Sequence, residues 1–197
     1  IPGDKVRLTL DTEIQKTAFD ELMKWAKGRG MPGAAVMLDV NTGAVRCLAS
    51  VPSYDPNQFA RGISKADWKA LQENELKPQI NRAVGMRLAP GSTFKVVTSA
   101  AGLETGETDP DRTEFCSGSI NLGKWKKKCH KLSGHGSINI EEAIAKSCDI
   151  YFYRLGQRLG PERMAEYARK FGLGSKTGID LPAVEDAGVV PDPEWKR

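Results

Sequence analysis

The most informative part of the sequence is residues 90–103, Pro-Gly-Ser-Thr-Phe-Lys-Val-Val-Thr-Ser-Ala-Ala-Gly-Leu. Pro90 and Gly91 predict a turn, and the residues from Ser92 onward predict a helix that is apolar on nearly every side. Such a helix is expected to lie in the core. Lys95 lies in the first turn of this helix. It is expected to have a specific partner or function there, because an unpaired buried ammonium is costly.

The spacing of Ser92 and Lys95 predicts a nucleophile beside its base. Residues three apart lie on one face of a helix, so the Lys95 amine can reach the Ser92 hydroxyl. A serine is a poor nucleophile until a base takes its proton, and desolvation can lower the pKa of a lysine enough for that task. Free N–H groups at the helix N-terminus favour a developing oxyanion. The simpler alternative is a capping serine with a surface lysine.

The N-terminal half of the chain predicts a β-hairpin. Residues 34–40 and 44–51 are apolar and flank Asn41-Thr42-Gly43, which is typical of a turn between two strands. Residues 5–10 alternate between apolar and polar types, as a half-buried strand does. Asp11 or Thr12 would then cap a helix.

The rest of the chain predicts mainly helices. They are expected over residues 64–75, from 139 through the region of 149, and over 161–172. Turn residues and short β-like pieces fill residues 108–136. This order predicts an α+β fold, a sheet flanked by helices with a mainly helical subdomain.

Further motifs accompany the 90–95 element. They are Ser147-Cys148-Asp149 (an S-x-D element), Thr177-Gly178-Ile179-Asp180-Leu181-Pro182, residues 39–56 and Asn81-Arg82-Ala83. Together these motifs resemble class B penicillin-binding proteins, and in particular their elongation-specific branch. The similarity covers nearly the whole chain. It implies a penicillin-binding, serine β-lactamase-like transpeptidase fold.

The resemblance also implies a peptidoglycan D,D-transpeptidase. Ser92 would attack the penultimate D-Ala carbonyl of a stem peptide that ends in D-Ala-D-Ala, and an amine of a neighbouring stem would resolve the acyl-enzyme. β-Lactam antibiotics would acylate the same serine. Lys95 would be the base, and Ser147 a proton relay toward the leaving group. Asp149 stands where many relatives have Asn, and it would orient Lys95 or the substrate amide by accepting a hydrogen bond.

The same resemblance implies a setting in cell-wall elongation and cell shape. The parent protein would be anchored by an N-terminal helix at the periplasmic face of the bacterial inner membrane, with a membrane glycan polymerase as partner. The abrupt start at residues 1–4 and the end at residue 197 favour an internal segment. Residues 1–197 are therefore expected to be an incomplete transpeptidase domain with weak or no activity of its own.

The third motif of the family, K-[ST]-G on a strand, is expected outside this chain. Lys176-Thr177-Gly178 matches its letters. However, it follows Asp149 closely and runs directly into the T-G-I-D-L-P element. A three-residue motif arises easily by chance, so we do not expect this copy to be catalytic.

The cysteines leave two interpretations open. Cys47 lies in an apolar strand and is expected to be a buried thiol. In an oxidising periplasm Cys116 and Cys129 could form a disulfide across a hairpin, which leaves Cys148 as a free thiol beside the S-x-D element.

Alternatively, Cys116, Cys129, His135 and Cys148 form a closed Cys₃His structural zinc site. The spacing lacks the usual C-x₂-C pairs, but zinc is the interpretation we favour. Zinc would tie residues 108–136 to the helix that follows and would preorganise the catalytic residues. His130 is a possible substitute ligand. No cofactor is expected for catalysis.

The charge balance gives no support for nucleic-acid binding. The sequence has 29 basic and 25 acidic residues, a net charge of +4, whereas a nucleic-acid binder needs a dense basic face. The one charge run, Lys124-Trp125-Lys126-Lys127-Lys128, is expected to be a solvated loop or hairpin. Contact with an anionic lipid or a cell-wall polymer is the alternative. No stretch is long and apolar enough to span a membrane, and no signal peptide is visible.

Two other functions share the S-x-x-K element. A serine β-lactamase or β-lactam sensor domain would also be acylated by penicillin, but a lactamase would deacylate within seconds. In a non-catalytic scaffold, Ser92 and Lys95 would be merely structural.

Overall fold

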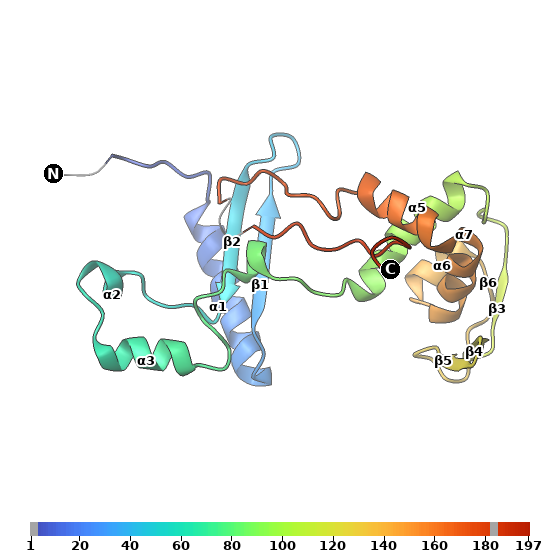
Figure 1. Cartoon of the computed structure of the whole chain (residues 1–197), viewed down its shortest axis with the longest axis horizontal. Helices are drawn as coiled ribbons and strands as arrows, with labels where there is room; N and C mark the ends of the chain where they lie inside the picture. Colours follow the sequence, from blue (N-terminus) through green and yellow to red (C-terminus); the bar gives the residue numbers. More distant parts are fainter. Residues whose placement is uncertain (1–3, 182–184) are drawn as a thin grey trace. The chain divides into compact units, whose positions relative to one another are not determined.

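The computed structural model describes residues 4–181 and 185–197, which fall into two compact units (Figure 1). The first unit contains the chain as far as Arg87, with a return segment that includes Ile179 and Asp186. The second unit extends from Leu88 to Gly178 and includes the C-terminal residues. Within the described ranges no helix is long and apolar enough to cross a membrane.

The first unit is a β-hairpin covered by a helix. Helix α1 (Thr12–Arg29) begins at Asp11, whose side chain accepts hydrogen bonds from two N–H groups of the first turn. Strands β1 (Gly33–Leu38) and β2 (Val45–Val51) are antiparallel, which confirms the predicted hairpin. Every second residue of β2 from Cys47 is buried, so the expectation of a buried thiol is confirmed.

The two edges of this hairpin differ. Gln15 of α1 caps the outer edge of β2, because its amide group accepts from Leu48 N at 2.8 Å and donates to Leu48 O at 3.0 Å. The outer edge of β1 has no ladder partner among the described residues. Val36, Met37 and Leu38 on this strand are each about half exposed.

The predicted strand over residues 5–10 is wrong. This segment has no ladder partner in the described parts of the chain, and Val6 is 82% exposed. Only Thr9 connects it to the hairpin, where its hydroxyl donates to Val45 O at 2.8 Å. An alternating pattern specifies a strand only where a neighbouring strand can pair with it.

After β2, the chain of the first unit forms short helices. They are α2 (Asn57–Ala60), α3 (Lys65–Glu73) and α4 (Arg82–Gly85). Ser64 caps α3 through the N–H of Asp67, so the helix predicted over residues 64–75 is confirmed with an earlier end.

The second unit packs a short helix against a long one, with small strands at one side. The elements are the 3₁₀ turn η1 (Gly91–Phe94), α5 (Lys95–Glu104), β3 (Glu114–Cys116), β4 (Ser119–Leu122), β5 (Trp125–Lys128), β6 (Gly136–Ile138), α6 (Ile140–Ala145) and α7 (Asp149–Lys170). Strand β3 pairs with β6, and β4 with β5, both antiparallel. Helix α5 packs on α7 around buried Ala101, Ile150 and Leu155.

Three helix predictions need correction. The stretch from Ser92 begins as a 3₁₀ turn. The expected burial is found in the middle of α5, where residues 97–102 are buried or half-buried, whereas Val96 near its start is 54% exposed. The helix capped by Asn139 ends at Ala145 instead of continuing to residue 149. The predicted start at Pro161 corresponds to a break inside α7, where Gly160 has φ 73°.

Candidate active site and cysteine cluster

Ser92 lies in η1, directly before α5. The turn needs Gly91, whose φ of 58° is in the left-handed region that favours glycine. Thr93 closes the turn, because its hydroxyl donates to Pro90 O at 2.6 Å. Ser92 is exposed, as an attacking hydroxyl must be.

Lys95 is held by three acceptors. Its Nζ donates to Asp149 Oδ1 at 2.7 Å, to Ser147 O at 2.8 Å and to Ser147 Oγ at 3.0 Å. The ammonium also lies 5.5 Å from the ring centre of Phe152. Only 12% of the Lys95 side chain is exposed. The structure thus supplies the partners that a buried ammonium requires.

Three of the four predicted catalytic residues therefore meet directly. The described residues give no hydrogen bond between Ser92 and Lys95; the lysine contacts Ser147 and Asp149 instead. Ser92 is placed beside this group by chain connectivity, three residues before Lys95.

Ser147 owes its position to an unusual backbone conformation. It lies between α6 and α7 with φ 49°, which non-glycine residues rarely adopt. The turn is closed by Ser147 N donating to Ile144 O at 3.0 Å and by Cys148 N donating to Ala143 O at 2.8 Å. This conformation directs both the carbonyl and the hydroxyl of Ser147 to Lys95. Strain of about 1–3 kcal/mol at one residue is typical of functional sites.

Asp149 accepts hydrogen bonds both from Lys95 and from the loop that contains His130. Its second oxygen, Oδ2, accepts from the backbone N–H of His130 at 3.1 Å. Burial by itself would raise the pKa of Asp149, but the hydrogen bonds from Lys95 and His130 lower it below its usual value. The carboxyl group is therefore ionised and accepts at both oxygens. The contact from His130 could not be read from the sequence, because a backbone donor has no residue signature.

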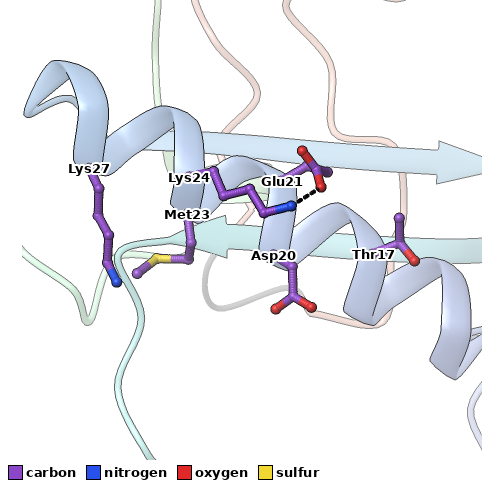
Figure 2. Close-up of a pocket in the computed structure, with 6 residues that line it drawn as sticks. All are labelled: Thr17, Asp20, Glu21, Met23, Lys24 and Lys27. Atoms are coloured by element: carbon purple, nitrogen blue, oxygen red, sulfur yellow. Dashed lines mark hydrogen bonds and ion pairs between the residues drawn. The ribbon is translucent and has the colours of Figure 1, made fainter.

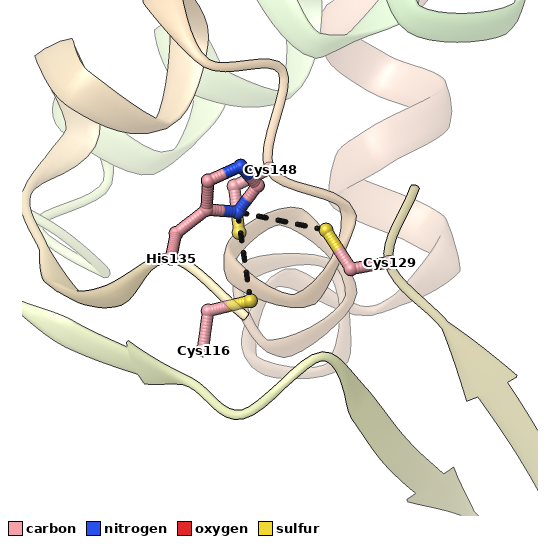
Figure 3. Close-up of side chains that lie close together, drawn as sticks. All are labelled: Cys116, Cys129, His135 and Cys148. Carbon is pink, nitrogen blue, oxygen red and sulfur yellow. Dashed lines mark hydrogen bonds between the residues drawn. The ribbon is translucent and has the colours of Figure 1, made fainter. Parts of the chain in front are cut away.

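The second cluster is the one expected for metal or disulfide chemistry (Figure 3). One ligand atom each from Cys116, Cys129, His135 and Cys148 lies within 4.8 Å of all the others. His135 Nδ1 is 3.6 Å from the sulfurs of both Cys116 and Cys129. The three sulfurs are buried, and all three cysteines are free thiols. His130, the substitute considered from the sequence, groups with Cys129 and Asp149 instead.

A glycine allows the His135 loop to approach β3. Gly134 has φ 78°, and a Cβ built there would lie 2.1 Å from Cys116 O. Any side chain at this position would therefore push His135 away from Cys116. The Gly-His-Gly sequence thus has a steric function in bringing the imidazole to the thiols.

The environment of the cluster affects each ligand differently. Burial raises the pKa of the Cys148 thiol to about 12. Burial would also raise the pKa of Cys116, but hydrogen bonds from backbone N–H groups, first that of Gly118, lower it. Burial lowers the pKa of His135, with a further effect from the neighbouring positive charges of Lys131 and Lys146. A neutral imidazole with a free lone pair is the form that binds metal ions.

The two clusters are adjacent in the chain. Cys148 directly precedes Asp149, and Cys129 directly precedes His130, whose N–H donates to Asp149. Anything that fixes Cys129 and Cys148 therefore also fixes both ends of that hydrogen bond.

Two other candidate features show no comparable chemistry. A hollow of about 410 Å³ on α1 is lined by residues of that single helix, two of which, Lys24 and Glu21, form an ion pair (Figure 2). Lys176-Thr177-Gly178 lies in no strand, unlike the family motif that it matches in letters. Pro182, the last residue of the T-G-I-D-L-P element, lies outside the described residues.

Comparisons with known proteins agree on one family. The model of the penicillin binding protein transpeptidase domain matches residues 33–197. Peptidoglycan D,D-transpeptidase MrdA of Acinetobacter baumannii is 38% identical over 98% of this chain, and MrdA of Escherichia coli K12 is 36% identical over 99%. The chain spans only 28% and 30% of the lengths of these two relatives.

Solved structures give the same result. Pseudomonas aeruginosa PBP2, in complex with WCK 5153, superimposes with a TM-score of 0.88 at 35% identity, over 100% of this chain and 44% of that one. Penicillin-binding protein A of M. tuberculosis, as its penicillin G acyl-enzyme complex, gives a TM-score of 0.81 at 32% identity, over 90% of this chain and 42% of that one. The predicted α+β transpeptidase fold is therefore confirmed.

Proposed function

The chain belongs to the family of penicillin-binding protein transpeptidase domains, and on that premise we propose that it is part of a peptidoglycan D,D-transpeptidase with Ser92 as the nucleophile. The observation that carries the proposal is the buried Lys95, which directly follows the Ser92 turn and is held by Ser147 and Asp149. These contacts place the amine three residues after an exposed serine and within 3.0 Å of a second hydroxyl, that of Ser147, as a base and a proton relay require.

In the proposed reaction Ser92 Oγ attacks the penultimate D-Ala carbonyl of a stem peptide. Lys95 must first release the proton that its ammonium form donates to Asp149; the free amine then takes the hydroxyl proton as the ester bond forms. Ser147 Oγ, 3.0 Å from Lys95 Nζ, relays a proton to the departing D-Ala nitrogen as the C–N bond breaks. Asp149 holds Lys95 in place throughout. The amine of a second stem then displaces Ser92 and forms the cross-link.

We also propose that further strands of the parent protein complete this domain. The free, half-exposed edge of β1 supports this, because native proteins rarely leave such an apolar strand unpaired. The missing third motif would lie on one of these strands. The chain on its own is then expected to have weak or no activity.

The test is labelling of the full-length protein with a fluorescent penicillin. The proposal predicts a label that persists for many minutes and is absent from Ser92→Ala. Turnover within seconds would identify a β-lactamase instead. If the full-length protein is not labelled, and Ser92→Ala leaves cross-linking unchanged, the scaffold alternative is correct.

A structural zinc ion is the second proposal, and the residues fit it. A tetrahedral site with Zn–S of about 2.3 Å and Zn–N of about 2.05 Å places sulfur and nitrogen about 3.6 Å apart. His135 Nδ1 lies 3.6 Å from two of the sulfurs. Four protein ligands leave no open position, so the ion would have a structural and not a catalytic role. It would fix Cys129 and Cys148, and through them the contact between His130 and Asp149.

Native mass spectrometry tests the zinc proposal. The purified protein should show the mass of one zinc ion above that of the same sample denatured without reductant. Cys148→Ser should lose this excess and should also lose thermal stability, whereas Cys47→Ser, which changes another buried thiol, should keep the metal. Absence of metal, with two hydrogens missing from the denatured chain, would instead support the Cys116–Cys129 disulfide.

The partner and the cellular location are also inferred from relatives. One solved structure is a complex of Helicobacter pylori PBP2 with MreC, and another concerns a peptidoglycan synthase complex that coordinates polymerization and crosslinking. We propose a comparable partner, a membrane glycan polymerase, and a location at the periplasmic face of the inner membrane. Co-purification of the full-length protein with such a polymerase from membranes would test both; recovery in the soluble fraction alone would contradict them.

A further inference from the structure

The hairpin of β4 and β5 is a basic surface that the proposed catalysis does not use. Figure 1 shows it at the lower edge of the second unit. All four residues of β5 are exposed, and Trp125 at the turn is 65% exposed. The hairpin contains Lys124, Lys126, Lys127 and Lys128, and no acidic residue occurs between Ser117 and Cys129.

The strand register distributes these side chains over both faces. Lys126 is paired with Asn121 and Lys128 with Ser119, so these two lysines share one face. Trp125 and Lys127 lie on the opposite face. The hairpin therefore offers positive charge on both sides and an aromatic ring at its tip.

These lysines have no carboxylate partner among the described residues. Elsewhere in the chain Lys16, Lys24, Lys146 and Lys170 each form an ion pair with a carboxylate on the same helix. Neighbouring like charges repel one another, so four unpaired lysines in five residues weaken the hairpin on its own. An anionic partner would remove this cost.

The base of the hairpin lies next to the candidate catalytic residues. Cys129 N donates to Gly118 O at 2.9 Å and closes the hairpin. The next residue, His130, donates its N–H to Asp149, which holds Lys95. A ligand bound along β5 therefore lies close to the backbone of His130, which donates to the Asp149 carboxylate.

We propose that the β4–β5 hairpin recruits peptidoglycan strands by binding the free carboxylates of their stem peptides. This inference rests on the proposed function, because it assigns the hairpin to the same substrate as Ser92. Exposed ammonium groups attract carboxylates over several ångströms and raise association rates. The ring of Trp125 offers a flat apolar surface to the sugar rings or alanine methyl groups of the strand.

The test compares two triple variants of the full-length protein with the same charge change. Lys126→Gln/Lys127→Gln/Lys128→Gln removes the charges of β5. Lys16→Gln/Lys24→Gln/Lys27→Gln, on the exposed face of α1, is the matched control. Both are tested for co-sedimentation with purified insoluble peptidoglycan, either native or with its carboxylates amidated, and for acylation by penicillin.

The proposal predicts that the β5 variant binds native peptidoglycan about 10-fold more weakly at low salt, with the difference disappearing at about 1 M salt. Amidated peptidoglycan should bind the parent and the β5 variant equally. Equal loss in the α1 control, or unchanged binding of the β5 variant, would overturn the proposal. Binding to phosphatidylglycerol vesicles is measured in parallel. A β5 variant that binds peptidoglycan normally but has lost binding to these vesicles would also overturn the proposal, because it would indicate a lipid partner. Penicillin acylation of the β5 variant should remain normal; if the parent protein is not acylated either, it is the proposed function that fails.

Discussion

Replacement of Asp149 by Asn tests the arrangement of the candidate catalytic residues. The carboxylate now accepts two hydrogen bonds, from Lys95 at 2.7 Å and from His130 N–H at 3.1 Å. An amide has only one acceptor oxygen, so its NH₂ group must face one of these two donors. Asp149→Asn therefore loses one hydrogen bond and the ion pair.

The size of the loss follows from burial. The Lys95 side chain is 12% exposed and that of Asp149 26%, so solvent screens the pair only in part. A hydrogen bond between charged groups contributes about 1.5–3 kcal/mol in such surroundings. We take about 2 kcal/mol as the cost of losing the correct position of Lys95. If this cost adds to the activation free energy, the acylation rate should fall about 30-fold.

The assay is the second-order rate of penicillin acylation of the full-length protein. Asp20→Asn is a matched control, because Lys16 and Asp20 are also 2.6 Å apart but their side chains are 78% and 46% exposed. The control should react at the parent rate. An Asp149→Asn variant that is folded and reacts at the parent rate would refute the positioning role of Asp149.

Three further predictions concern the second unit. Glu114 accepts from Arg158 at 2.6 Å and from Arg154 at 3.1 Å. Glu114→Gln removes the charge and leaves one acceptor oxygen for these two donors, which should lower the free energy of unfolding by about 2 kcal/mol at pH 7. Burial would raise the pKa of Glu114, but the arginine hydrogen bonds lower it below 4.5, so this stabilisation is present above pH 4.5 and is lost as the pH falls through the lower folded value. Urea titrations at pH 7 and pH 3 should show the difference shrinking in acid. Tyr151→Phe leaves the buried Thr108 hydroxyl without its 2.7 Å partner and should lower the free energy of unfolding by about 1–3 kcal/mol in the same titration. Gly102→Ala places a Cβ 2.9 Å from two methyl carbons of α7 and should lower the free energy of unfolding by about 1–3 kcal/mol in the urea titration, whereas an unchanged free energy would mean that the two helices can separate at no cost.

Some of the fold and the site followed from local patterns. The hairpin around Asn41 and the capped helix α1 were predictable because their turn and capping residues act on their own backbone. The partners of Lys95 were predictable in kind, since a lysine in an apolar helix requires acceptors. That these acceptors belong to Ser147 and Asp149 came from the family resemblance and not from spacing.

Other features depend on tertiary structure and were not predictable. The left-handed backbone of Ser147 interrupts a pattern that predicts one continuous helix, because a single strained residue has no periodicity. The hydrogen bond from His130 N–H to Asp149 joins backbone and side chain across a loop. The alternation of residues 5–10 predicted a strand, but a strand also needs a neighbouring strand, and this segment pairs with none among the described residues.

The most direct test of the central claim is to map the penicillin adduct on the full-length protein. After brief exposure to penicillin, proteolysis and tandem mass spectrometry should find the penicilloyl mass on Ser92, and Ser92→Ala should carry no adduct. A stable adduct on any other residue, or none at all on a folded protein, would contradict the assignment of Ser92 as the nucleophile.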